Sequence, residues 1–208
     1  MPLATQERSE PPEQFTRTAD NSALYTALTE AVGGSNISEK AGCLIEPDYR
    51  LIRVDHRLVA SCGHGFEIAL VDDAEFSVAY YARFTLLQIP EAGSRLVAQY
   101  KLWRSTSVRH SPVLSEISQT VLFKYIVHDY NLFLTDEAVT GDGKFYWFRQ
   151  MSRAIELDLH VYAYDLKTRA LRPISTQRAL ADMQEQVWSD TAPECLRAII
   201  SIFPLDRQ

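Results

Sequence analysis

A stretch of positive charge stands out in the middle of this 208-residue chain. Residues 92–115 include no aspartate or glutamate, yet they carry four cations: Arg95, Lys101, Arg104 and Arg109. The whole chain has a formal net charge of −6, so this segment departs from the overall acidic balance. Guanidinium groups bind carboxylates and phosphates through paired hydrogen bonds. The charge pattern therefore predicts an anion-binding segment.

The loop after Trp103 combines these cations with hydroxyl groups. Its candidate anion ligands are Arg104, Ser105, Ser107, Arg109 and Ser111. Ser111 followed by Pro112 predicts a helix start, because a capping hydroxyl and then proline are typical of a helix N-terminus. Backbone N–H groups and the positive end of the helix dipole favour a phosphate or pyrophosphate there. The alternative is a solvated basic loop whose serines only cap the helix.

A second group of reactive side chains follows a short apolar strand predicted over residues 131–135. Asp136 and Glu137 end that strand, and Tyr146 lies near the start of a helix predicted over residues 144–157. This order places two carboxylates and a phenol near one sheet edge, where each can exchange a proton with a substrate. The alternative is that the acids serve a turn and the tyrosine packs in the core.

The first half of the chain is rich in strand patterns. Alternating and β-branched residues predict strands over residues 49–60, 66–71, 76–89 and 95–103. Short turns between them indicate an antiparallel meander, and a helix is predicted before them at 22–32. Tyr80 and Tyr100 suit either the core or a surface on which nucleic-acid bases stack. The alternation of strand faces favours the core.

The second half alternates helices and strands. Apolar residues at helical spacing predict a helix over 111–128, and a strand hairpin is predicted at 160–174. Further helices are predicted at 175–188 and 193–203. This order predicts an α+β chain with a mostly antiparallel central sheet flanked by helices.

Over residues 49–174 the order of elements resembles the later part of a GNAT-like N-acyltransferase. The matching elements are a strand, a basic loop that opens a helix, a strand, a helix and a closing strand pair. The resemblance implies that the basic loop holds the pyrophosphate of acetyl-CoA or a related acyl-CoA. It also implies that Asp136 or Glu137 takes a proton from an amine substrate and that Tyr146 protonates the departing thiolate.

A non-catalytic function is the alternative. The family's loop usually carries glycines, which allow close approach of the backbone to the pyrophosphate. This chain has no glycine between Ser94 and Thr140. The alternative is therefore an α+β protein-binding module, of phage or mobile-element origin, that acts on a protein partner through its acidic surface and N-terminal arm.

Composition limits the remaining choices. The proline-containing residues 1–20 predict a flexible arm, 21–174 the main domain and 175–208 a helical extension. The acidic balance argues against nucleic acid, and no apolar run is long enough for a membrane helix. Three widely spaced cysteines and no secretory leader predict free thiols and a cytoplasmic location. Metal-ligand spacing is absent from the sequence.

Overall fold

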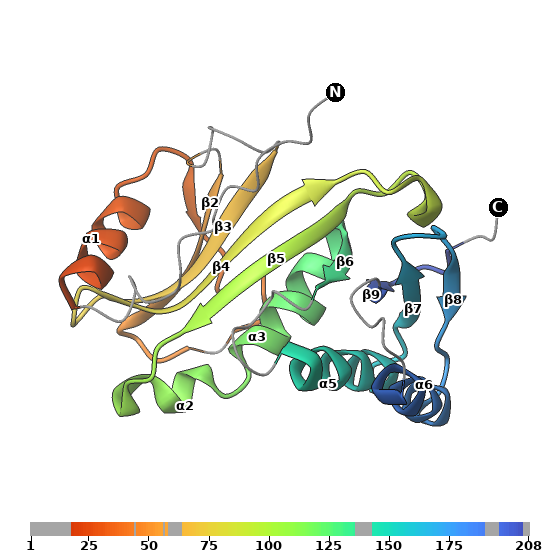
Figure 1. Ribbon diagram of the computed structural model, residues 1–208. Coiled ribbons are helices and arrows are strands. Elements are labelled where there is room, and N and C mark those ends of the chain that lie inside the picture. The colour runs from red at the N-terminus through yellow and green to blue at the C-terminus, as the bar shows by residue number, and fades with distance from the viewer. Residues whose placement is uncertain are drawn as a thin grey trace, which may run out of the picture.

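The computed structural model describes residues 18–43, 45–55, 57, 64–135, 143–189 and 196–205. Within this part of the chain, nine strands form one sheet in the order β1-β2-β3-β4-β5-β6-β9-β7-β8 (Figure 1). The strands are β1 (Gly34–Asn36), β2 (Tyr49–Asp55), β3 (Gly65–Asp72), β4 (Ser77–Leu87), β5 (Val97–Arg104), β6 (Asn131–Leu134), β7 (His160–Asp165), β8 (Leu171–Pro173) and β9 (Leu196–Ser201). Neighbouring strands are antiparallel except for β5 and β6, which confirms the predicted α+β class and mostly antiparallel sheet.

Helices cover both faces of the sheet. They are α1 (Thr18–Thr29), α2 (Ser111–Leu114), α3 (Ile117–Gln119), α4 (Val127–Asp129), α5 (Gly143–Glu156) and α6 (Gln177–Ser189). Two 3-10 turns, η2 (Pro90–Ala92) and η3 (Val108–His110), and a π-helical segment, η4 (Thr120–Ile126), complete the described elements. The helices after β5 lie on one side of the sheet and α1 on the other (Figure 1). Among the described helices, none combines the length and the apolar character needed to cross a membrane.

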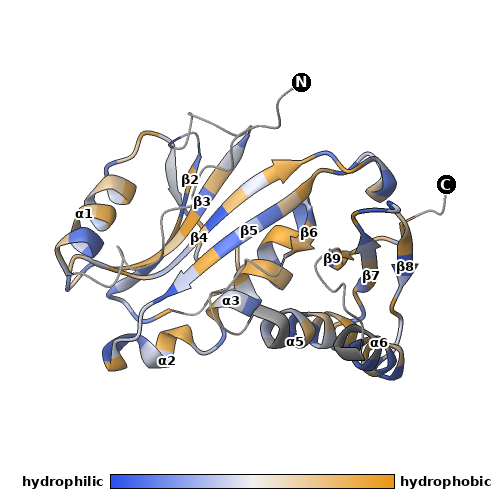
Figure 2. Cartoon of the chain, in the orientation of Figure 1, coloured by the Kyte–Doolittle hydropathy of each residue, from blue (hydrophilic) through white to orange (hydrophobic). Residues whose placement is uncertain are grey.

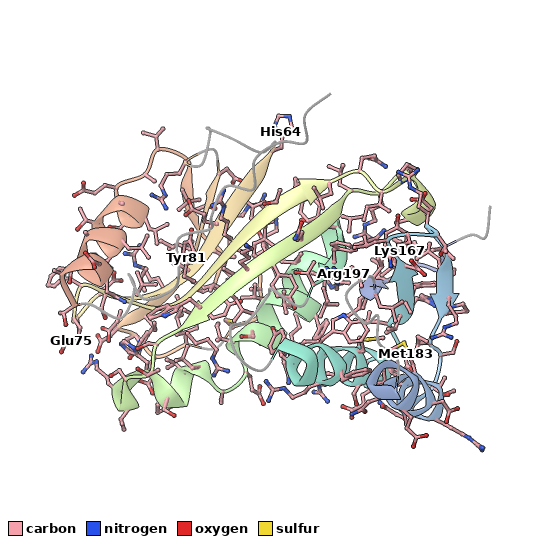
Figure 3. All side chains as sticks on the ribbon, in the orientation of Figure 1. His64, Glu75, Tyr81, Lys167, Met183 and Arg197 are labelled. Atoms are coloured by element: carbon pink, nitrogen blue, oxygen red, sulfur yellow. The ribbon has the colours of Figure 1, made fainter. Side chains whose placement is uncertain are left out.

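The predicted meander is present as β2 to β5. Apolar and polar residues alternate along β4 and β5 (Figure 2). The core under the helices includes Ala82, Phe84, Ala98 and Tyr100. On the opposite face, Arg83 of β4 lies across from Lys101 of β5 in the strand register. Buried side chains fill the space between sheet and helices, as Met183 of α6 illustrates (Figure 3). Strand periodicity thus places alternate residues of β4 and β5 on the face under the helices that follow β5.

A βαβ unit connects the meander to the rest of the sheet. β5 and β6 are parallel, and the segment from η3 to α4 crosses between them. A parallel pair needs such a crossover because a tight turn cannot join two strands that run the same way. The predicted single helix over residues 111–128 is interrupted at residues 115–116 and includes the π-helical turns of η4. The crossover therefore positions the basic loop at the carboxyl end of β5.

The C-terminal region differs from its prediction. Residues 196–201 form strand β9 rather than a helix, and β9 lies antiparallel between β6 and β7. Ala198, Ile199 and Ile200 are fully buried. A short apolar run of this kind suits a buried strand as well as a helix, and periodicity alone does not separate the two. Residues 175–208 are thus no purely helical extension, because β9 completes the central sheet.

A buried amide helps to hold helix α1 to the sheet. The first residue of the helix is Thr18, so the last three residues of the predicted arm are helical, and residues 1–17 lie outside the described chain. The Asn21 amide donates to the Val78 carbonyl at 3.0 Å, and the Val78 N–H donates to the Asn21 side-chain oxygen at 2.7 Å. Asn21 is 9 % exposed. This pair of bonds fixes α1 against the start of β4.

We expect Asn21→Ala to lower the free energy of unfolding by about 2–3 kcal/mol, because it leaves the Val78 N–H and C=O without these partners. Urea denaturation measures the loss. The neighbouring Ser22→Ala change leaves the amide pair intact and should alter stability by less than about 0.5 kcal/mol. Equal losses in the two variants would contradict this role for Asn21.

Candidate functional site

Tyrosines from two adjacent strands meet α5 under the helical layer. Tyr80 on β4 lies opposite Arg104 on β5. Tyr100 lies four residues before Arg104 on the same strand, so it faces the same side of the sheet as Tyr80. Tyr146 enters from α5, and its hydroxyl oxygen lies 3.5 Å from that of Tyr100. The structure thus joins the predicted site residue Tyr146 to a tyrosine of the sheet.

The three phenols differ in burial. Tyr80 and Tyr100 are 0 % and 1 % exposed, whereas Tyr146 is partly exposed. Burial raises the pKa of Tyr146 to about 12, and the hydrogen bond with Tyr100 limits this rise. Burial also raises the pKa of Tyr80 and of Tyr100 well above the ordinary value. All three phenols are therefore protonated at neutral pH, with Tyr146 nearest the surface.

Some buried polar atoms near the carboxyl ends of β5 and β6 lack hydrogen-bond partners within the described residues. The hydroxyls of Tyr80 and of Ser118, on α3, lie near each other without forming a hydrogen bond of normal geometry. Thr135, directly after β6, also has a buried hydroxyl with no partner. Buried polar groups in proteins nearly always find a partner, which is often water or a ligand. Buried hydroxyls without a well-formed hydrogen bond to the described residues therefore lie near the carboxyl ends of β5 and β6.

The arginines of the basic loop bind groups of the protein itself. The Arg109 Nε donates to an oxygen of Asp72 at 2.8 Å, and the same guanidinium lies 3.6 Å from Glu75. Arg104 donates to the carbonyl oxygen of Leu114 at 2.5 Å. One arginine is thus directed to the turn after β3 and the other to the end of α2. The two predicted phosphate ligands do not share a partner.

The serines of the loop make local contacts or face solvent. The Ser105 hydroxyl accepts the backbone N–H of Ser107 at 3.1 Å, which shapes the turn before η3. Ser107 and Ser111 are exposed. Asp136 and Glu137, the predicted proton acceptors, lie outside the described residues. Their predicted role therefore stays a prediction.

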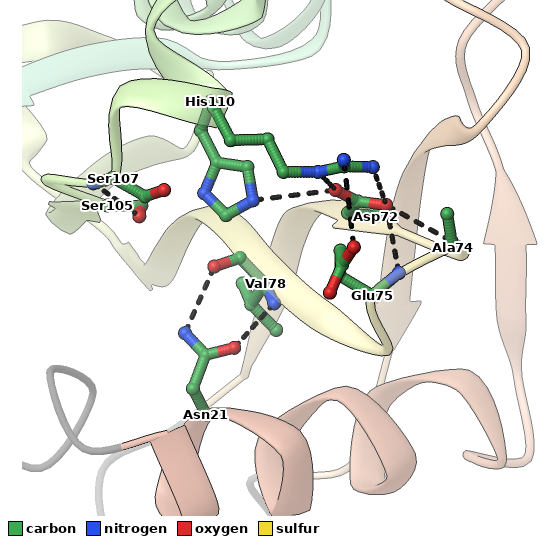
Figure 4. A network of polar contacts seen from close by, with 9 residues as sticks. Asn21, Asp72, Ala74, Glu75, Val78, Ser105, Ser107 and His110 are labelled. Carbon is green, nitrogen blue, oxygen red and sulfur yellow. Dashed lines mark hydrogen bonds and ion pairs between the residues drawn. The ribbon is translucent and has the colours of Figure 1, made fainter.

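A buried aspartate organises the contacts of Arg109 (Figure 4). The Asp72 side chain is 0 % exposed and accepts the backbone N–H groups of Ala74 and Glu75 at 3.1 and 3.2 Å. His110 Nε2 lies 3.5 Å from the same carboxylate. Burial alone would raise the pKa of Asp72, but the hydrogen bond from Arg109 and those of the turn hold it below its ordinary value. Asp72 thus connects the turn after β3 to the start of the crossover.

His110 makes the stability of this connection depend on pH. Its side chain is 7 % exposed, and burial lowers its pKa below the ordinary 6.5, with Asp72 opposing the shift and Arg109 reinforcing it. The unfolded chain therefore takes up a proton at higher pH than the folded chain, so stability falls as the pH drops below about 6.5.

The glutamine in His110→Gln cannot titrate. We therefore expect the melting temperature of this variant to fall less than that of the native chain when the pH is lowered from 7.5 to 5.5. Thermal melts at these two pH values measure the difference. Identical losses in both proteins would show that His110 does not contribute to the pH dependence.

Three residues of this region were not predicted as site residues. The strand pattern places Tyr80 and Tyr100 in the core, where they lie, but it does not show that the Tyr100 hydroxyl meets Tyr146 of α5. Asp72 was not among the predicted site residues. Strand register brings Tyr80 opposite Arg104, and register was not fixed by the sequence pattern.

Comparison with other proteins adds no family. No protein-family model, curated protein or solved structure matches the chain. Within the described residues there is also no cluster of three or more histidine, cysteine, aspartate or glutamate side chains that could hold a metal ion.

Proposed function

We propose that the protein transfers an acyl group from acyl-CoA to an amine, as a GNAT-like N-acyltransferase, at the carboxyl ends of β5 and β6. The parallel β5–β6 pair carries this proposal. Its pairing ends at Gln99 and Phe133, while β5 continues to Arg104. Ligands of open α/β sheets bind beyond the carboxyl ends of parallel strands. Tyr146 contacts Tyr100 at the first β5 residue past this pairing.

The order of the elements supports the same proposal. The basic loop and the helices from α2 to α4 follow β5, then come β6 and α5. The antiparallel β7–β8 pair is the last of the elements that resemble the GNAT-like order.

The chemistry requires a proton at the leaving sulfur. In the proposed reaction, the amine nitrogen bonds to the thioester carbonyl carbon, the carbon–sulfur bond breaks and the thiolate departs. Tyr146 gives its proton to that thiolate, and Asp136 or Glu137 takes a proton from the amine. Solvent returns the proton from the carboxylate to Tyr146. A phenol with a pKa of about 12 remains protonated at neutral pH, so it is ready to act as the donor.

In this proposal the phosphate end of the substrate lies along the basic loop. Ser107 and Ser111 are exposed on the loop, whereas Arg109 is bound to Asp72. We therefore propose that Ser105, Ser107, Ser111 and Arg104, whose guanidinium also donates to the Leu114 carbonyl, contact the pyrophosphate, while Arg109 shapes the loop through Asp72. In this proposal Arg109 contributes through its bond to the protein and not through the phosphate.

Amine-dependent release of coenzyme A thiol tests the transfer. The native chain is mixed with acetyl-CoA or longer acyl-CoAs and a panel of primary amines, and free thiol is measured. Thiol release that requires both partners supports the proposal. No release with any pair, together with no rise in melting temperature at millimolar coenzyme A, would refute it, since a ligand at 100 times its dissociation constant adds about 2.7 kcal/mol of stability.

A second candidate is the non-catalytic α+β protein-binding module. Two observations favour it: Arg109 is committed to Asp72, and the loop lacks glycine. This function requires no acyl-CoA, and it uses the acidic surface and residues 1–20 on a protein partner. Affinity purification of the full chain and of a chain lacking residues 1–20 tests it. Equal recovery of the same partner would discard the role of these residues.

A further inference from the structure

The hydroxyls of Tyr100 and Tyr146 are in contact, and Tyr100 is the more deeply buried of the two residues. The two hydroxyl oxygens are 3.5 Å apart, and either oxygen can be the donor by distance alone. Tyr100 lies on a central strand at 1 % exposure. Tyr146 is on α5 and is partly exposed. A ligand at the carboxyl ends of β5 and β6 therefore reaches Tyr146 before Tyr100.

The surrounding charges favour electron density on Tyr146. The Arg149 guanidinium lies 5.8 Å from the centre of the Tyr146 ring, and Arg104 acts on Tyr146 in the same direction. Tyr80, which lies deeper, adds a third neutral hydroxyl beside the pair. A hydroxyl hydrogen is directed to the oxygen that can best carry negative charge. These neighbours make Tyr146 the acceptor and Tyr100 the donor.

We propose that Tyr100 is a positioning residue whose hydroxyl donates to the Tyr146 oxygen and thereby leaves the Tyr146 hydrogen free to point toward the carboxyl ends of β5 and β6. A phenol oxygen has one hydrogen to donate. Once Tyr146 accepts from Tyr100, its own hydrogen is free for a group outside the pair. The inference deepens the proposed acyl transfer and rests on it for the identity of that group, the departing thiolate.

Ring-fluorinated tyrosine provides a probe that needs no acyl-CoA. Fluorine makes the phenol more acidic, and its resonance reports ionisation of one chosen ring. Fluorotyrosine is placed at position 146 of the full chain, and at position 100 of a second sample. We expect position 146 to titrate at lower pH than position 100. The reverse order would overturn the inference, and this comparison deletes no hydroxyl.

Removal of the Tyr100 hydroxyl, the proposed donor, gives a second test of the inference. With fluorotyrosine at position 146, Tyr100→Phe should raise the titration midpoint by about one pH unit, because a hydrogen bond to the ionised form is lost. Tyr164→Phe is the matched control, since the Tyr164 hydroxyl bonds Glu91 on the other face of the sheet. An unchanged or lowered midpoint in the Tyr100→Phe chain would overturn the inference.

The two proposals can fail separately. A raised midpoint in a chain that binds no acyl-CoA supports the Tyr100–Tyr146 pair and refutes the transferase. An unchanged midpoint in a chain that releases thiol refutes the pair and leaves the transferase in place. In an active chain, Tyr100→Phe should lower kcat by up to roughly tenfold with little change in KM, as a shift of one unit allows.

Discussion

Replacing Tyr146 with phenylalanine is expected to lower the rate constant of acyl transfer roughly 100- to 1,000-fold, the size of a lost general acid. The departing thiolate would lose the one phenol that contacts the carboxyl end of β5 from α5. Because the phenol acts when sulfur departs, the affinity for acyl-CoA should change little. Single-turnover kinetics of thiol release, with a separate binding measurement, distinguish the two effects.

Tyr164→Phe is the control for this prediction. It removes one hydroxyl from β7, where Tyr164 donates to Glu91 at 3.2 Å, and leaves the Tyr100–Tyr146 contact intact. We expect its transfer rate to equal that of the native chain. A native rate in Tyr146→Phe, or an equal loss in both variants, would remove Tyr146 from the chemistry.

The largest loss of stability is expected from Asp72→Ala. The change removes a fully buried carboxylate that accepts hydrogen bonds from Arg109 and from the N–H groups of Ala74 and Glu75. Donors left without an acceptor cost free energy, so the unfolding free energy should fall by about 3 kcal/mol. Urea denaturation with far-UV circular dichroism measures this loss.

The adjacent aspartate supplies a matched comparison. Asp73 is also held by an arginine, Arg50, and by the Tyr25 hydroxyl at 2.8 Å, but its side chain is 33 % exposed. Ion pairs in contact with water contribute little, so Asp73→Ala should cost about 1 kcal/mol. A larger loss for Asp73→Ala than for Asp72→Ala would show that burial is not what makes the Asp72 network strong.

Acid should weaken the Asp72 network in a predictable direction. The folded-state pKa of Asp72 lies below its ordinary value, because the hydrogen bonds from Arg109 and from the turn overcome the effect of burial. Its contribution is therefore complete above about pH 4 and is lost as the pH falls through the folded-state value. The loss that begins below about pH 6.5 belongs instead to His110.

Local patterns in the sequence predicted much of the fold. Alternating residues and short turns identified the meander, and the Ser111–Pro112 pair identified the start of the crossover. β9 was missed because Ala198, Ile199 and Ile200 form an apolar run without a strand-specific period. Its place between β6 and β7 depends on contacts with residues far away in the chain, which local patterns do not contain.

The candidate site was predictable only in its residue types. Tyr146 could be singled out because it opens a helix after a strand. Its partner Tyr100 could not, since a strand tyrosine that packs in the core and one that presents a hydroxyl have the same pattern. Arg109 was predicted to bind phosphate, but its guanidinium binds the Asp72 carboxylate instead. Asp72 lies 37 residues earlier, so this pairing depends on the tertiary fold.

The most direct test of the proposed site is a titration of the isotope-labelled full chain with acetyl-CoA, followed by amide resonances in NMR spectra. The proposal predicts saturable shifts at residues 100–111, at Thr135 and around Tyr146, with α1 unaffected. An absence of shifts at millimolar acetyl-CoA, or shifts confined to α1 and its face of the sheet, would contradict it.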